Sequence, residues 1–201
     1  MRKAFYSLVA AAVLALPLVV RAADTEGVCV GGKPIAPIKI EVFSDYQCPA
    51  CREFYLGTMR SVLSDYADAG KVCVVYREFP LNMHQHAREA AKYGAAAMRM
   101  GPRYWKEVTD ALYLNQDKWA SDGNIQAVIA TEMTKSDMTR LQKEMNNPAV
   151  EATISSDMEL GKKLDVNQTP TFFITAKGKT EKVAGVVQYA ILRRYLDDKL
   201  K

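Results

Sequence analysis

The 201-residue sequence is poor in histidine and cysteine and has only a small excess of positive charge. Two histidines and four cysteines leave few candidates for a metal site built from these residue types. Lys and Arg together number 27 against 23 Asp and Glu, and three of the basic residues lie within the first 21 positions. Without those three, the formal net charge falls from +4 to +1. The remaining basic residues alternate with acidic ones and form no patch, so we expect no nucleic-acid partner.

The sequence has one long apolar run, at its N-terminus. Two basic residues precede an apolar segment over residues 8–20, and Val20-Arg21-Ala22 fits a small-residue cleavage site. We interpret residues 1–22 as a cleaved secretory signal peptide, with an uncleaved membrane anchor as the alternative. The predicted location is therefore the periplasm or another exported compartment, where thiols tend to be oxidised. The rest of the sequence suits one globular domain with an insertion.

Two cysteines two residues apart stand where an apolar β run gives way to a helical pattern. Cys48 occupies the expected N-cap position, and Pro49 fits the first helical position, where its missing N–H is not needed. The first free N–H groups, those of Ala50 and Cys51, and the helix dipole favour the Cys48 thiolate. A thiolate is the attacking species in disulfide exchange. The pattern predicts a redox dithiol with an exposed attacking Cys48 and, on the apolar stripe, a buried resolving Cys51.

A zinc half-site and a static disulfide are the alternatives for this motif. Zinc would need two more ligands, and the four candidates, Cys29, Cys73, His84 and His86, lack the paired spacing of a closed site. Two histidines near a helix start are more often capping or packing residues. We therefore expect no metal, and dithiol exchange needs no organic cofactor.

The motif lies in a predicted strand–helix–strand unit. Residues 38–43 form a strand, a helix runs from Pro49 to about Asp68, and residues 71–77 form the next strand. So short a unit is a right-handed crossover with parallel strands. A short strand at residues 27–30 precedes it.

A helical block and a final β-hairpin follow. The predicted helices cover residues 85–100, 102–115, 124–135, 136–146 with Ser136 as the cap, and 148–164. A strand at 171–175 and an antiparallel partner at 180–184 come next, and a helix over 188–201 ends the chain.

Three segments together resemble one known family. They are Phe43-Ser44-Asp45-Tyr46-Gln47-Cys48-Pro49-Ala50-Cys51, Arg77-Glu78-Phe79-Pro80-Leu81 and Thr169-Pro170-Thr171-Phe172-Phe173. With the helical block before the last of them, the sequence resembles the DsbA-like group of exported thiol:disulfide oxidoreductases, in the thioredoxin superfamily. The resemblance implies an α/β, thioredoxin-like fold with an inserted all-helical domain. Its parts would be residues 23–81, the insertion at 82–165, and residues 166–201.

The resemblance also implies roles for site residues. Cys48 would attack and Cys51 would resolve the mixed disulfide, while Pro170 would be a cis proline packed against the sulfurs. Thr169 would offer its backbone to an extended substrate segment, because a cis X-Pro bond turns the preceding backbone outward. Pro49 and Ala50 complete the expected substrate-binding set.

Three positions depart from the family pattern. Ala50 stands where strong oxidants often have histidine, Val42 where a buried acid is common, and Gln168 where glycine is common. Loss of the histidine donor predicts a smaller lowering of the attacking pKa. Glu41, one residue before Val42, should face the other side of the sheet by strand alternation. It is therefore not expected to accept the Cys51 proton.

In the DsbA-like arrangement the first short strand pairs with the strand after the active-site helix, which would place Cys29 beside Cys73. We expect a structural disulfide there, with two buried free thiols or a second exchanging pair as alternatives.

The predicted function is to introduce disulfides into reduced or unfolded protein substrates. By resemblance, a membrane-bound, quinone-linked thiol oxidase would reoxidise the protein, which is expected to be a monomer. A reductase or isomerase using the same dithiol, and a non-catalytic periplasmic peptide-binding chaperone, are the alternatives.

Overall fold

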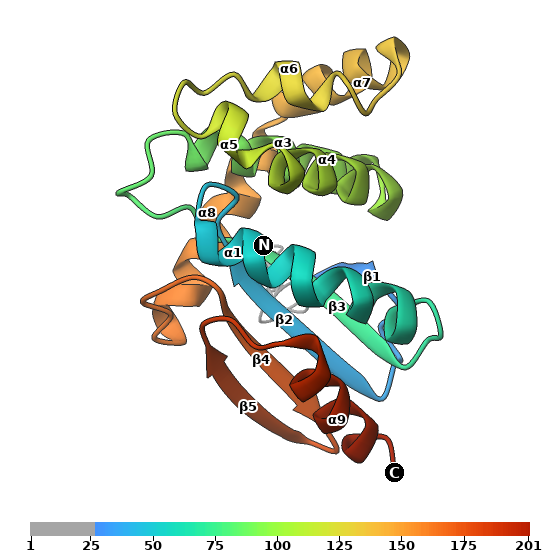
Figure 1. Ribbon diagram of the computed structural model, residues 1–201. Helices are drawn as coiled ribbons and strands as arrows, with labels where there is room; N and C mark the ends of the chain where they lie inside the picture. The colour runs from blue at the N-terminus through green and yellow to red at the C-terminus, as the bar shows by residue number, and fades with distance from the viewer. Residues whose placement is uncertain (1–26) are drawn as a thin grey trace, which may run out of the picture.

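The computed structural model describes residues 27–201, so the predicted signal peptide at residues 1–22 lies outside the described part. Five strands form one mixed sheet in the order β1-β3-β2-β4-β5 (Figure 1). Their bounds are β1 (Cys29–Gly31), β2 (Ile38–Ser44), β3 (Val72–Glu78), β4 (Thr171–Ala176) and β5 (Lys179–Ala184). Strands β2 and β3 are parallel, and the other neighbouring pairs are antiparallel. The predicted α/β fold is confirmed.

One continuous helical stretch connects β2 to β3. It consists of α1 (Pro49–Phe54), η1 (Tyr55–Met59), α2 (Arg60–Val62) and η2 (Leu63–Ala67). The predicted single α-helix is wrong in detail, because η1 and η2 are π-helical turns. In the second of these, the Asp68 N–H donates to the Leu63 carbonyl, five residues back, at 3.0 Å. A π turn adds a residue per turn without changing which residue types are buried, so the apolar spacing did not reveal it.

Six helices lie between β3 and β4. They are α3 (Ala87–Met100), α4 (Pro102–Leu114), α5 (Gln116–Trp119), α6 (Ile125–Ile129), α7 (Lys135–Met145) and α8 (Pro148–Lys163). The predicted helix over 124–135 is too long, since α6 ends at Ile129 and a turn follows. The predicted Ser136 cap is also wrong: the Thr134 hydroxyl accepts the Asp137 N–H at 3.1 Å and begins α7. Within the described residues, no helix combines the length and apolar character needed to cross a membrane.

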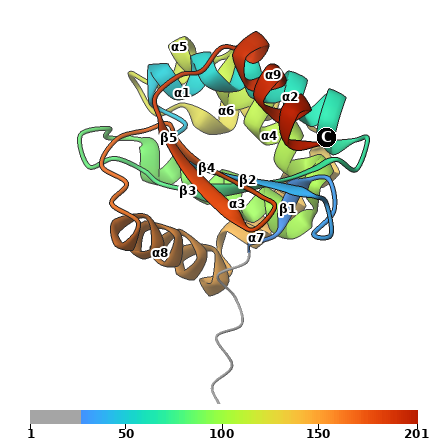
Figure 2. The ribbon, with the colours of Figure 1, turned by 90° about the horizontal axis from the view of Figure 1, so that it is seen from below.

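The sheet is covered on both faces. In Figure 2, α1, α2 and α9 (Tyr189–Lys199) lie on one side and α8 on the other. On the α1 side, Phe54 stacks on Phe172 with ring centroids 4.8 Å apart. On the α8 side, Phe43 meets Phe79 and Phe173 edge-on at 5.9 and 5.8 Å. Alternate residues of β2 therefore enter two separate apolar layers, and the first cysteine of the motif follows the end of this central strand.

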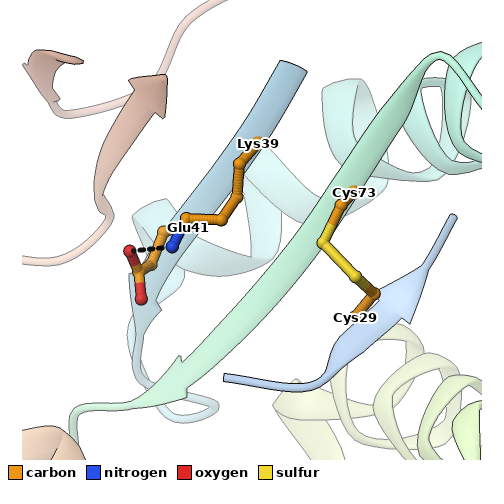
Figure 3. Close-up of a disulfide and its surroundings, with 4 residues drawn as sticks. All are labelled: Cys29, Lys39, Glu41 and Cys73. Atoms are coloured by element: carbon orange, nitrogen blue, oxygen red, sulfur yellow. Dashed lines mark ion pairs between the residues drawn. A yellow bond between two sulfur atoms is a disulfide. The ribbon is translucent and has the colours of Figure 1, made fainter. Parts of the chain in front are cut away.

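A disulfide connects β1 to β3. Cys29 and Cys73 are bonded, with an S–S distance of 2.12 Å (Figure 3). Cys73 is paired in register with Lys39 of β2, which makes an ion pair of 3.4 Å with Glu41. By alternation along β3, Cys73 shares its face with Arg77, on the α8 side of the sheet and away from α1.

A buried ion cluster fixes α8 to this face. Arg77 donates to Glu41 Oε1 through Nε at 2.7 Å and to Asp157 Oδ1 through Nη1 at 2.9 Å. The other Asp157 oxygen accepts the Glu78 N–H at 3.0 Å. Glu41 thus faces α8, as strand alternation predicts, and its carboxylate is occupied away from Cys51.

Candidate redox site

Cys48 and Cys51 are free thiols at the start of α1. Cys48 is the N-cap residue in an extended conformation, and Pro49 follows at the first helical position. The expected exposure of Cys48 is wrong, since its side chain is only 7% exposed, against 1% for Cys51. The cause is a loop distant in sequence: the Cys48 thiol donates to the Thr169 carbonyl oxygen at 3.5 Å.

That covering loop contains a cis peptide bond between Thr169 and Pro170. Two contacts hold it: the Gly185 N–H donates to the Pro170 carbonyl at 2.8 Å, and the Thr171 hydroxyl donates to the Gln168 carbonyl at 2.8 Å. Thr169 and Pro170 are buried against the sulfur, whereas Pro49 is exposed and Ala50 half-buried. The structure therefore gathers the four residues expected to bind substrate around Cys48.

The two thiols differ in acidity. The pKa of Cys48 is lowered from an ordinary value of 9.0 to about 5, chiefly by a hydrogen bond from the Cys51 thiol. Burial opposes this shift, while Thr169 and the N–H groups of Cys51 and Ala50 add to the lowering of the Cys48 pKa. Burial raises the pKa of Cys51 well above its ordinary value, and the neighbouring Cys48 raises it further. Near pH 7 the pair holds one thiolate, at the more accessible sulfur.

The sequence predicts that the N–H groups at the start of the helix are the main hydrogen-bond donors to the Cys48 sulfur, and this prediction is only partly correct. Among the described residues, none makes a hydrogen bond of ordinary capping geometry to the Cys48 side chain. The helix N–H groups still lower the Cys48 pKa, but the largest contribution comes from the Cys51 thiol. Ala50 has no side-chain donor to offer the sulfur, yet the pKa of Cys48 is lowered to about 5.

Asp45 organises the loop that leads to Cys48. Its buried carboxylate accepts the Gln47 N–H at 2.7 Å and the Leu81 N–H at 2.9 Å, and it contacts His84 Nδ1 at 2.7 Å. His84 therefore serves this loop, and the His86 N–H donates to the Gln47 side chain at 2.7 Å. Within residues 27–201, no group of three or more His, Cys, Asp or Glu side chains is placed to hold a metal ion.

The helical insertion also holds the site. Gln116 of α5 donates from Nε2 to the Tyr46 carbonyl at 2.7 Å and to the Cys48 carbonyl at 3.1 Å. In return, Gln47 donates to the Ala120 carbonyl at 2.7 Å. Sequence reasoning missed Gln116, because a lone glutamine 68 residues after Cys48 carries no local signal. Asp45 and Gln47 lie in the segment 43–51 that resembles the family, but their roles depend on partners that only the fold brings near.

Replacing Thr169 by valine is expected to raise the Cys48 pKa. Thr169 Oγ1 is buried, has no hydrogen-bond partner of ordinary geometry among the described residues, and lies where it lowers the pKa of Cys48. A hydrogen bond to a charged group is worth about 1.5–3 kcal/mol, so Thr169→Val should shift the pKa by about one to two units. Thiolate absorbance during a pH titration of the reduced protein measures it.

The control for that titration is Thr171→Val, which removes a nearby hydroxyl that bonds the Gln168 carbonyl rather than the sulfur. An unchanged titration midpoint in Thr169→Val would show that this hydroxyl does not stabilise the thiolate.

Comparisons with known proteins place the chain in a family and find solved structures with a similar fold. A sequence model of the family described as Thioredoxin matches residues 24–198. A relative named probable disulfide bond formation protein D, from Bacillus cereus, is 25% identical over 147 residues, covering 71% of this chain and 68% of the relative. The crystal structure of alpha-DsbA1 from Wolbachia pipientis has a TM-score of 0.70 at 23% identity, covering 83% of this chain and 87% of that one. Oxidised BdbD from Bacillus subtilis has a TM-score of 0.67 at 19% identity, covering 87% and 97%.

Proposed function

The chain belongs to the thioredoxin family as a DsbA-like thiol:disulfide oxidoreductase, and from this premise we propose that it is exported and introduces disulfides into other proteins through Cys48 and Cys51. The observation that carries the proposal is the unequal pair: a Cys48 with a lowered pKa beside a buried Cys51 with a raised one. A stable Cys48 thiolate favours the reduced form of the pair. The oxidised pair is then a stronger oxidant.

The exchange proceeds in two steps. A substrate thiolate attacks Cys48 Sγ of the Cys48–Cys51 disulfide; the new S–S bond forms as the old one breaks, and the electron pair leaves on Cys51 Sγ. A second substrate thiolate then attacks the first substrate sulfur, which releases Cys48 as its stabilised thiolate. Two substrate thiols become one disulfide, and Cys48 and Cys51 take up the two electrons.

The substrate is a reduced or unfolded protein segment that lies extended against the Thr169–Pro170 loop. Backbone hydrogen bonds to Thr169 would recognise any sequence, in the manner of an added strand, while Pro49 and Ala50 line the approach to Cys48. Residues 1–22 would direct export as a signal peptide and would then be cleaved. The protein would act as a monomer, and a membrane-bound, quinone-linked thiol oxidase would restore its disulfide.

The equilibrium of the Cys48–Cys51 pair with a glutathione buffer tests the proposed direction. We expect a reduction potential within about 30 mV of −120 mV, which is the value of a strong oxidant. Thioredoxin, a reductant, has a potential of about −270 mV. Mass analysis of alkylated samples across the buffer series gives the reduced fraction. A potential close to about −270 mV would overturn the oxidase assignment and favour the reductase alternative.

A matched pair of variants tests the roles of the two sulfurs. Incubated with a reduced, unfolded substrate protein in an oxidising buffer, Cys51→Ser is expected to accumulate a mixed disulfide at Cys48, whereas Cys48→Ser should form none. Cys48→Ser should also lose disulfide transfer to the substrate while remaining folded. If the Cys48→Ser variant kept its effect on the folding of the substrate protein, the result would instead indicate a peptide-binding chaperone.

A further inference from the structure

A chain of buried hydroxyl groups begins at Cys51. Ser44 lies where a hydrogen bond from its side chain lowers the pKa of Cys51, and the Asp45 N–H donates to the Cys51 sulfur at 3.5 Å. Ser44 Oγ lies 2.9 Å from the Tyr113 hydroxyl, which lies 2.5 Å from the Tyr76 hydroxyl. At both hydroxyl–hydroxyl links either oxygen can be the donor. A chain with this property can reverse its direction, as proton conduction requires.

Three separate elements contribute to this chain. Ser44 is the last residue of β2, Tyr76 lies on β3, and Tyr113 comes from α4 of the insertion. By strand alternation, Ser44 and Tyr76 point to the side of the sheet that α1 covers, which is where Cys51 is buried. The arrangement therefore depends on the insertion packing over the ends of the two central strands.

The last residue of the hydroxyl chain also borders a cavity. Tyr76 lines a space of about 680 Å³ together with residues of β3, α3 and α8. Val28 and Thr153 also line it and are exposed, so the cavity opens to solvent. A cavity of this size with polar groups in its wall holds water. Tyr76 therefore belongs both to the hydroxyl chain and to the wall of this cavity.

Cys51 needs such a connection because its own surroundings are dry. Cys51 is 1% exposed, and the reaction removes or adds a proton at its sulfur in every cycle. The nearest carboxylate along the backbone, that of Asp45, is directed to Gln47, Leu81 and His84 instead. Glu41 is bound to Arg77 on the opposite face of the sheet.

We propose that Ser44, Tyr113 and Tyr76 form a relay that carries the Cys51 proton to and from the solvent cavity. When the Cys48–Cys51 bond breaks and the electron pair leaves on Cys51 Sγ, Ser44 gives its proton to that sulfur. Tyr113 then reprotonates Ser44, Tyr76 reprotonates Tyr113, and water in the cavity reprotonates Tyr76. During reoxidation the same protons move the other way. The inference rests on exchange at Cys48 and Cys51 but not on its net direction.

Neighbouring tyrosines supply a matched control. Tyr55 stacks on Tyr113 with ring centroids 4.9 Å apart, but its hydroxyl donates to Asp110 at 3.0 Å, away from the sulfurs. Tyr55→Phe therefore removes a buried hydroxyl from the same aromatic cluster without interrupting the relay. Tyr113→Phe interrupts it at its middle and keeps the ring that packs there.

The test measures both rate constants for exchange with glutathione, forward and reverse, together with the equilibrium constant. A relay accelerates both directions equally, so Tyr113→Phe should slow each by at least about tenfold and leave the equilibrium constant within about twofold of wild type. Ser44→Ala should behave in the same way, and Tyr55→Phe should match wild type. The solvent isotope effect on the exchange rate should fall in Tyr113→Phe.

Two outcomes would overturn the relay. One is wild-type rates in Tyr113→Phe; the other is a rate change accompanied by an equal change in the equilibrium constant, which indicates a role in stability alone. Because glutathione exchange occurs in oxidases and reductases alike, a potential that contradicts the oxidase assignment would leave this test valid.

Discussion

In its reduced form, the wild-type protein is expected to gain stability over a Cys48→Ala variant as the pH rises from 5 to 8. The pKa of Cys48 is about 5 in the folded protein against an ordinary 9.0, so the folded state binds fewer protons over this range. The stabilisation is complete above the ordinary pKa and is lost as the pH falls through the folded one. One pKa unit corresponds to about 1.4 kcal/mol, which gives a difference of about 4 kcal/mol between pH 5 and pH 8.

Urea unfolding at several pH values, in excess reductant, measures the effect in both proteins. Oxidised wild-type protein is the control, because a disulfide sulfur does not titrate and its stability should lack this component. Parallel pH profiles for the reduced wild type and the Cys48→Ala variant would contradict the lowered pKa.

The preference for the reduced form that we propose for this pair would follow from the same linkage. The free energy that stabilises the folded, reduced protein through its thiolate is absent from the oxidised protein. Formation of the Cys48–Cys51 disulfide must therefore give up the thiolate's hydrogen bonds from Cys51 and Thr169. Passing the disulfide to a substrate with ordinary thiols recovers them.

Removal of the Cys29–Cys73 disulfide is expected to cost about 4 kcal/mol of unfolding free energy. The bond closes a loop with a sequence separation of 44 residues, and loop-closure entropy of the unfolded chain gives this figure. The best background is a Cys48→Ala and Cys51→Ala protein, in which Cys29–Cys73 is the disulfide that a reductant can break. Urea unfolding with and without reductant then compares one sequence with itself.

Exchange at the redox site should survive this loss. Cys73 lies on the α8 face of β3, whereas Cys51 is buried on the α1 face, so the two pairs are separated by the sheet. A Cys29→Ala and Cys73→Ala variant should exchange with glutathione at the wild-type rate at a temperature where it stays folded. A slower rate would favour the alternative in which this pair relays electrons.

The local parts of the site could be predicted from the sequence. Pro49 after Cys48 marks a helix start, and Pro170 before a β-branched and aromatic run marks a strand entry, because proline restricts its own backbone. The order of strands and helices followed for the same reason: apolar periodicity and turn residues act over short distances. The ends of the helices and the type of helical turn were predicted less well, as the early end of α6 and the π turns show.

The features that could not be predicted depend on contacts between distant segments. Burial of Cys48 requires Thr169, 121 positions later, and the Ser44–Tyr113 contact spans 69 positions. A serine at a strand end and a tyrosine on a helix are ordinary residues in ordinary places. Whether their hydroxyl groups meet depends on how α4 crosses the sheet, and residue periodicity does not fix that packing angle.

Gln116 and Tyr113 have a consequence for evolution and engineering. Both lie in the insertion, yet one anchors the Cys48 carbonyl and the other is hydrogen-bonded to Ser44. The helical segment between β3 and β4 is therefore part of the surroundings of the redox site. A chimaera that exchanged this segment for the corresponding segment of a homologue would inherit part of that homologue's reactivity. A substitution in the insertion can therefore change the surroundings of both sulfurs while the Cys48–Cys51 motif itself is unchanged.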